Sequence, residues 1–244
     1  DIIILDGEKG VVVINPSKKV HDAYLKEQSR YMVKVKALKK LKSYKAATID
    51  GHKLELNANI EFVEETGAAK ANNADGIGLF RTEFIYINRV NLPTEEQQFE
   101  SYKTVIEKMA PKPVTFRTLD IGGDKFLPYF KMFPEQNPYL GLRAVRLSLA
   151  NRTIFEQQIR AILRASAYGR ARIMFPMITL PEEFEKALAI LDEVKAEMSK
   201  KKIPFDESIK AGAMIEVPAA AILSDAIAKK AGFLSIGTND LIQY

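Results

Sequence analysis

The stretches GIGLFR, at residues 76–81, and VTFRTLD, at residues 114–120, decide the fold. Both are short apolar runs, which is typical of strands buried on both faces of a sheet. An amphipathic segment lies between them, and Thr94 with Gln97 forms the capping-box pattern of a helix start. This order of strand, helix and strand predicts a parallel sheet, because parallel neighbours need a long crossover connection.

The same alternation continues on both sides of these two strands. One further strand is expected before them, KLELNAN at 53–59, and three after them: RIMFPM at 172–177, AGAMIE at 211–216 and FLSIGTND at 233–240. Thr179 with Glu182 predicts the start of the helix that follows RIMFPM.

Two α/β architectures fit six βα steps, a doubly wound open sheet and a closed barrel. The glycine-rich phosphate turn that dinucleotide-binding sheets carry after their first strand is missing here, which favours the barrel. We therefore predict an α/β fold, a (β/α)8 TIM-type barrel that is incomplete in this sequence. It has about six of its eight βα units, so the chain is expected to be truncated just after the sixth strand.

A β-hairpin and a long helix are predicted ahead of the barrel. IIIL and VVVI flank the turn DGEKG, and both runs are rich in β-branched residues. Pro16 ends the second strand, and apolar residues at helical spacing run from Ser17 to about Tyr44. We predict three regions: the hairpin at residues 1–16, a linker helix at 17–48 and the barrel domain at 49–244.

Composition limits the functions that the chain can carry. Its 244 residues are 47% hydrophobic, enough for a sizeable core, and the absence of cysteine excludes disulfides and thiolate catalysis within the chain. The net charge of +5 suggests nucleic acid binding, but apolar residues recur at helical spacing in the lysine-rich segment 34–45 and leave its lysines as a solvated face. We expect no nucleic acid partner. Without a signal peptide or a long apolar run, we expect a cytoplasmic protein with no membrane insertion.

The reactive residues of a barrel lie at the C-terminal ends of its strands. Five polar residues occupy such positions in this sequence: Asn59, Arg81, Arg117, Glu216 and Asp240. An arginine at the end of an apolar strand is costly unless it meets an anion, and two on neighbouring strands fit a bidentate clamp on phosphate or carboxylate. The alternative is a structural role, in which the arginines pair with nearby carboxylates: Glu83, Asp120 or Asp124.

Glu216 and Asp240 are the candidate metal ligands. They end neighbouring strands of the predicted sheet, about 4.8 Å apart, so two carboxylates there can share one cation. Mg²⁺ commonly takes one or two protein carboxylates and completes its shell with water and substrate phosphate. The alternative is that both carboxylates pair with arginines: Arg81, Arg117 or Arg143. The turn GTND, which contains Asn239, offers backbone N–H groups to an anion.

Five motifs carry a family resemblance: GIGLFRTEF, RTLDIGGDK, NPYLGLRAVR, RIMFPM and IGTNDLIQY. In order and spacing they resemble the phosphoenolpyruvate-utilising enzymes, and most closely the enzyme I family of the bacterial sugar phosphotransferase system. RTLDIGGDK and FRTEFIYINRVNLPTEEQQF favour this family over pyruvate phosphate dikinase and phosphoenolpyruvate synthase. The resemblance covers almost the whole chain, and it makes the hairpin at residues 1–16 the tail of a phosphohistidine domain.

The resemblance implies a role for each candidate residue. Arg81, Arg117 and, as a third, Arg143 contact phosphoenolpyruvate, Glu216 and Asp240 bind Mg²⁺, and Asn239 with Asp240 contacts the substrate phosphate. It also implies a homodimer that transfers the phosphoryl group to a histidine of its phosphohistidine domain and then to the carrier protein HPr. His21 and His52 lie at no strand end, so we expect the acceptor histidine, like the acid cysteine of the family, outside this chain and no catalytic residue within it.

Two rival functions fit the same residues. One is a barrel of the pyruvate phosphate dikinase or phosphoenolpyruvate synthase type, which an upstream nucleotide-binding domain would reveal. The other is a non-catalytic module that senses phosphoenolpyruvate or mediates dimerisation.

Overall fold

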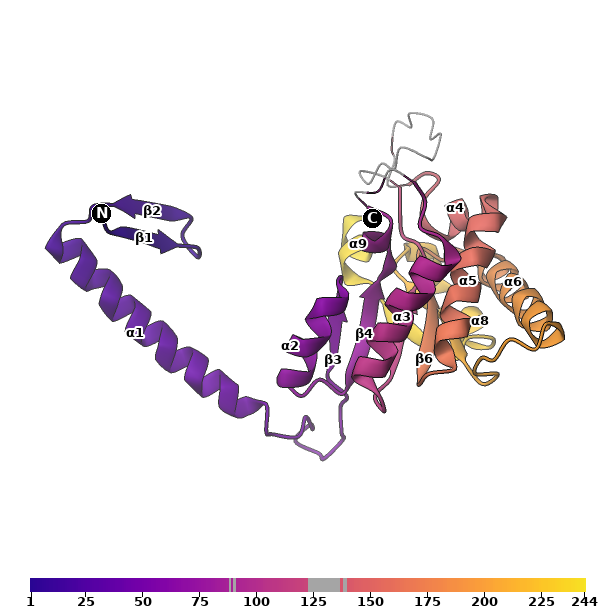
Figure 1. The fold of residues 1–244 in the computed structure, drawn as a ribbon, viewed down its shortest axis with the longest axis horizontal. Coiled ribbons are helices and arrows are strands. Elements are labelled where there is room, and N and C mark those ends of the chain that lie inside the picture. Colours follow the sequence, from indigo (N-terminus) through magenta and orange to yellow (C-terminus); the bar gives the residue numbers. More distant parts are fainter. Residues whose placement is uncertain (88, 90, 123–136, 138–139) are drawn as a thin grey trace. The chain divides into compact units, whose positions relative to one another are not determined.

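The computed structural model describes residues 1–244 except 88, 90, 123–136 and 138–139 (Figure 1). The chain divides into two compact units, Asp1–Leu54 and Glu55–Tyr244. Among the described residues no helix is both long enough and apolar enough to span a membrane.

The N-terminal unit consists of a hairpin and one long helix. Strands β1 (Ile3–Asp6) and β2 (Val11–Ile14) pair in antiparallel register, and α1 (Lys18–Leu41) follows them. The Ser17 hydroxyl caps α1 by accepting a hydrogen bond from the backbone N–H of Val20. The predicted hairpin and helix are therefore confirmed, and no residue of α1 is buried.

The C-terminal unit is built on a sheet of six parallel strands. Their order in the sheet follows the chain: β3 (Asn57–Ile60), β4 (Gly76–Arg81), β5 (Val114–Arg117), β6 (Ala171–Phe175), β7 (Lys210–Ile215) and β8 (Leu234–Ile236). Each strand pairs with the next in parallel, and the sheet curls in the manner of a barrel (Figure 1). This arrangement confirms the predicted α/β fold of an incomplete TIM-type barrel.

Helices connect the strands and cover one face of the sheet. They are α2 (Thr66–Ala71), α3 (Glu95–Met109), α4 (Ala144–Ala150), α5 (Arg152–Ser166), α6 (Pro181–Lys200), α7 (Pro218–Ile222) and α8 (Ser224–Ala228), with 3₁₀ turns η1 (Val63–Glu65) and η2 (Thr82–Ile85). A last helix, α9 (Thr238–Gln243), follows β8. Along this face α2 contacts α3, α3 contacts α5, and α5 contacts α6 (Figure 1).

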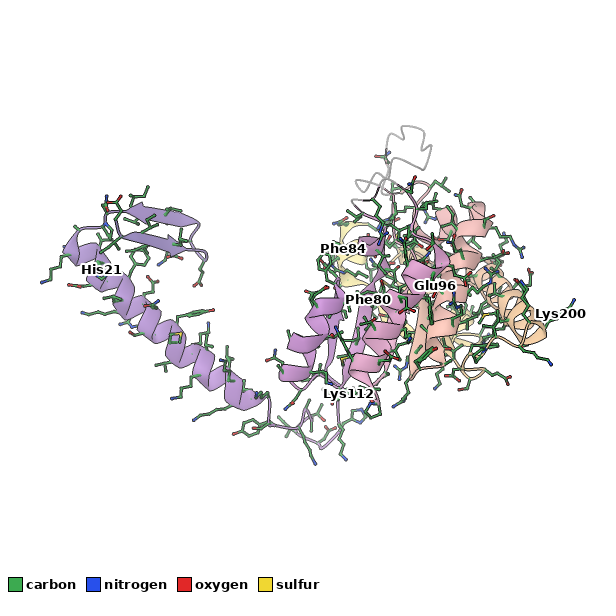
Figure 2. All side chains as sticks on the ribbon, viewed as in Figure 1. His21, Phe80, Phe84, Glu96, Lys112 and Lys200 are labelled. Carbon is green, nitrogen blue, oxygen red and sulfur yellow. The ribbon has the colours of Figure 1, made fainter. Side chains whose placement is uncertain are left out.

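Two apolar layers hold the sheet. The helix-covered face packs aromatic rings, and Phe80 of β4, labelled in Figure 2, meets Phe116 edge to face at 5.7 Å while Tyr102 of α3 covers both. The opposite face carries a smaller cluster of Leu79, Met174 and Met214. Because side chains alternate between faces, residue 79 points inward and residue 80 outward, which is the pattern of a barrel wall.

Several predicted boundaries were wrong; for example, the strand expected at 114–120 ends at Arg117. The strand expected at 53–59 begins only at Asn57, which pairs with Gly76, the first residue of β4. Just before it, the Leu56 N–H donates to the Asp75 carboxylate instead of to a neighbouring strand. The strand expected at 233–240 ends at Ile236, because Thr238, Asn239 and Asp240 of the GTND turn form the first turn of α9.

A further error concerns the start of α6. Its first turn is held by the Glu183 carboxylate, which accepts the backbone N–H groups of Thr179 and Leu180, and not by Thr179 with Glu182. The Thr179 hydroxyl instead accepts a hydrogen bond from Arg146 at 2.8 Å. By contrast, the capping box of Thr94 and Gln97 at α3 is confirmed, with both hydrogen bonds present.

Candidate functional site

A cavity of about 410 Å³ opens at the C-terminal ends of the strands. It gathers all five residues that the sequence placed at the strand ends together with Asn239: Asn59, Arg81, Arg117, Glu216, Asn239 and Asp240. They come from the ends of four strands and the first turn of α9. The topology thus brings together residues spread over more than half of the chain.

Arg117 is enclosed by carboxylates. Its Nη2 donates to Oε1 of Glu83 at 2.6 Å and its Nη1 lies 2.9 Å from Oδ2 of Asp120, and the side chain is only 8% exposed. Burial alone lowers the pKa of this guanidinium, but Asp120 and Glu83 outweigh burial and raise the pKa above its ordinary value. Arg117 therefore forms the structural pairs that the sequence left open as an alternative, and it lines the cavity as well.

A buried chain of hydrogen bonds supports Arg117 from behind. The Thr82 hydroxyl donates to the Arg117 carbonyl at 2.7 Å, and Gln158 of α5 donates to that hydroxyl at 2.9 Å. The amide oxygen of Gln158 accepts a hydrogen bond from the Leu119 N–H at 2.8 Å. One side chain from the helix layer thus ties down the backbone on both sides of residue 118.

Arg81 has a more open setting. It is the register partner of Arg117 on the adjacent strand, so the two side chains point into the same cavity. Its Nη1 donates to Oε1 of Glu61 at 2.5 Å, and the Arg81 side chain is 34% exposed. Asp124, the remaining carboxylate considered as a partner for the arginines, lies outside the described residues.

Glu216 is the most deeply buried acid of the cavity, with 1% exposure. Its Oε1 accepts the Met177 N–H at 2.6 Å. Burial, helped by the nearby charges of Asp120 and Asp240, raises the pKa of Glu216 from 4.5 to about 7, against the lowering effects of the Met177 hydrogen bond and of Arg117. A side chain at Gly237 would place its Cβ 2.5 Å from Oε2 of Glu216, so this acid needs a glycine beside it.

Arg143 does not line the cavity but contacts Asp240, which does. It precedes α4, and its guanidinium bridges two carboxylates, donating to Oδ1 of Asp240 and to Oδ1 of Asp120, each at 3.1 Å. The loop after β5 can approach it closely because residue 122 is a glycine with φ of 134°, where a Cβ would lie 2.2 Å from Cβ of Arg143. Arg143 therefore joins the ends of β5 and β8.

The donor set fits a hard divalent cation. Glu216 and Asp240 line one cavity, and the charge of Asp240 adds to the pKa rise of Glu216, so a cation between them would relieve the repulsion. The described residues contain no cluster of three or more such ligands, so water or a bound ligand would have to complete the shell. His21 lies on α1 (Figure 2) and His52 is exposed before β3; neither lines this cavity.

Sequence reasoning missed two residues that shape the site. Glu61 directly follows a strand and so carried the same signal as Arg81, a charged residue at a strand end. Gln158 had no such signal, because it lies within an amphipathic helix like many buried polar residues.

Comparison with known proteins identifies the family. Residues 35–244 match the model of the phosphoenolpyruvate-utilising enzymes, in their phosphoenolpyruvate-binding domain. The chain belongs to this family. The sequence resemblance is thereby confirmed.

Relatives in the family are similar along the whole chain. The phosphoenolpyruvate-protein phosphotransferases of Priestia megaterium, Geobacillus stearothermophilus and Staphylococcus aureus are 48%, 50% and 49% identical to it over 243 or 244 residues. Each match takes in 100% of this chain but only 42–43% of the relative. The chain thus spans less than half the length of these relatives.

Proposed function

We propose that this chain binds phosphoenolpyruvate with Mg²⁺ and supplies the substrate-binding part of a phosphoenolpyruvate-protein phosphotransferase. The observation that carries the proposal is the single cavity that holds two arginines, two carboxylates and the amide of Asn239 at the strand ends. The names of the relatives support this reaction over that of a dikinase or synthase.

In this proposal the arginines bind and orient the substrate. Arg117 is held ready by its buried carboxylates, and Arg81 supplies the second guanidinium, so that the two can grip a phosphate or carboxylate from adjacent strands. Arg143 keeps Asp240 in place, and Asn239 and the backbone at the start of α9 contact the phosphate. Glu216 and Asp240 would hold Mg²⁺, which neutralises charge on the phosphoryl group.

The phosphoryl acceptor is a histidine outside this chain. We propose that its ring nitrogen forms a bond to phosphorus as the bond to the enolate oxygen breaks, which releases the enolate of pyruvate. In the whole protein this histidine belongs to a phosphohistidine domain whose tail is the hairpin at residues 1–16, and residues 17–48 link it to the barrel at 49–244. The phosphoryl group then passes to HPr, and the protein works as a homodimer in the cytoplasm.

Calorimetric titration with phosphoenolpyruvate tests the binding step. We expect binding in Mg²⁺ that is lost or strongly reduced in EDTA, and affinity roughly 10- to 100-fold weaker in Arg81→Ala, because a charge-assisted pair to the ligand is removed. Arg170→Ala is the matched control, since Arg170 is exposed and precedes β6 at the opposite end of the strands. Equal affinity in the wild type, Arg81→Ala and EDTA would refute the proposed site.

A further inference from the structure

Glu61 has no part in the proposed chemistry, yet it contacts one of the two arginines that bind the substrate. Its Oε1 lies 2.5 Å from Nη1 of Arg81, with the side chains 33% and 34% exposed. It follows β3 directly, and Ile60 is the register partner of Phe80, so Glu61 and Arg81 are the next pair along the two strands. The contact therefore forms at the margin of the cavity, where solvent and ligand can reach it.

The turn that carries Glu61 is firmly held. The Glu65 carboxylate accepts the backbone N–H groups of Glu61 at 2.7 Å and of Phe62 at 2.9 Å. The Phe62 ring packs edge to face on Phe84 of η2, with 5.2 Å between ring centroids. Breaking the contact with Arg81 therefore requires only that the two side chains rotate, while the backbone stays in place.

We propose that Glu61 sets the affinity of the site by acting through Arg81: its carboxylate occupies the guanidinium until an anionic ligand displaces it. The inference rests on the proposed function, in which Arg81 binds that anion. A guanidinium presents its N–H donors as a fork, so a carboxylate and a ligand oxyanion compete for the same donors.

The same competition does not arise at Arg117. Its carboxylate partners Glu83 and Asp120 are buried, and removing either from the guanidinium would leave a charge in the interior. Arg117 therefore keeps its partners when a ligand arrives, and Arg81 exchanges its own.

Phosphoenolpyruvate titration in Mg²⁺ at about 0.15 M salt tests the inference in four variants of the chain. Glu61→Gln keeps the size of the side chain and removes its charge, and we expect affinity about two- to fivefold tighter than in the wild type, the range of a half-exposed ion pair. Glu64→Gln makes the same charge change three residues after Glu61, in the 3₁₀ turn η1, where the side chain is exposed, and should leave affinity within about 1.5-fold because salt screens it. In the Arg81→Ala background, Glu61→Gln should have no effect.

The outcomes separate this inference from the proposed function. No measurable binding in any variant would refute the proposed function and the inference with it. Binding that Arg81→Ala weakens, but that Glu61→Gln leaves unchanged or weakens, would refute the inference alone, because Glu61 would then support Arg81 without competing. Equal tightening in Glu61→Gln and Glu64→Gln, or tightening that persists without Arg81, would also refute it, since both outcomes indicate a general charge effect.

Discussion

The ends of β4 and β5 present the same residue type in two different environments. Arg117, at the end of β5, is buried between Glu83 and Asp120 and braced from behind through Thr82 and Gln158. Arg81, its register partner at the end of β4, forms an ion pair with Glu61 in which both side chains are about one-third exposed. One guanidinium is thus part of the folded core, and the other is free to exchange its partner at little cost to stability.

This difference separates stability from binding within one site. A buried ion pair is costly to break because the remaining partner is left as an uncompensated charge, whereas an exposed pair contributes little. Substitutions around β5 should therefore change the free energy of unfolding, and substitutions at the end of β4 should change ligand affinity.

The largest loss of stability is expected for Arg117→Ala. The change leaves Glu83 and Asp120 buried without this cation, and should lower the free energy of unfolding by about 3–5 kcal/mol. Urea unfolding followed by circular dichroism measures it, with Arg170→Ala as the control arginine. A loss below about 1 kcal/mol would show that the ion pairs at the end of β5 contribute no more to stability than the pair at the end of β4.

Glu216→Gln should change how stability depends on pH in metal-free buffer. Because the pKa of Glu216 rises from 4.5 to about 7 on folding, the folded state holds a proton between these values that the unfolded state has lost. Wild-type stability therefore contains a contribution that decreases as pH rises from about 4.5 to 7, up to roughly 3 kcal/mol.

The variant lacks this contribution. The free energy of unfolding of Glu216→Gln minus that of the wild type should therefore be larger at pH 8 than at pH 5. Urea unfolding at both pH values with EDTA present measures this difference. A difference between variant and wild type that is the same at both pH values would contradict the raised pKa.

An intermediate effect is expected for Gln158→Leu, which keeps the volume of the side chain but removes its hydrogen bonds. The buried Leu119 N–H then loses its acceptor, at a cost of about 1–3 kcal/mol. Gln157→Leu is the matched neighbour, since Gln157 makes one 3.3 Å bond from a partly buried position. If both variants unfold at the same urea concentration, the brace behind Arg117 contributes nothing.

The smallest effect on stability is expected for Arg81→Ala. Its pair with Glu61 is about one-third exposed, so the free energy of unfolding should fall by no more than about 1 kcal/mol, although the same variant loses ligand affinity. Unfolding and titration of one protein sample compare the two properties directly. A loss of stability as large as that of Arg117→Ala would remove the distinction between the two strand ends.

Most of the architecture could be predicted from the sequence, and the errors share one cause. The hairpin, the long helix and the six βα steps follow from local periodicity. The strand expected at 53–59 was predicted to start too early. It can begin only where its neighbour pairs with it, and β4 begins at Gly76, opposite Asn57. The start of α6 was misplaced because Arg146, 33 residues before Thr179, engages the hydroxyl that was expected to cap the helix.

The sequence by itself determined which residues stand at the strand ends, because the order of the strands and the parallel topology bring those ends to one side of the sheet. The tertiary structure decided which charges meet there. Arg143 and Asp240 are 97 residues apart, and Arg117 reaches back 34 residues to Glu83. Such partners depend on strand register, helix packing and side-chain direction together, and no local pattern records them. For the same reason only the folded chain distinguishes the fixed guanidinium of Arg117 from the exchangeable one of Arg81.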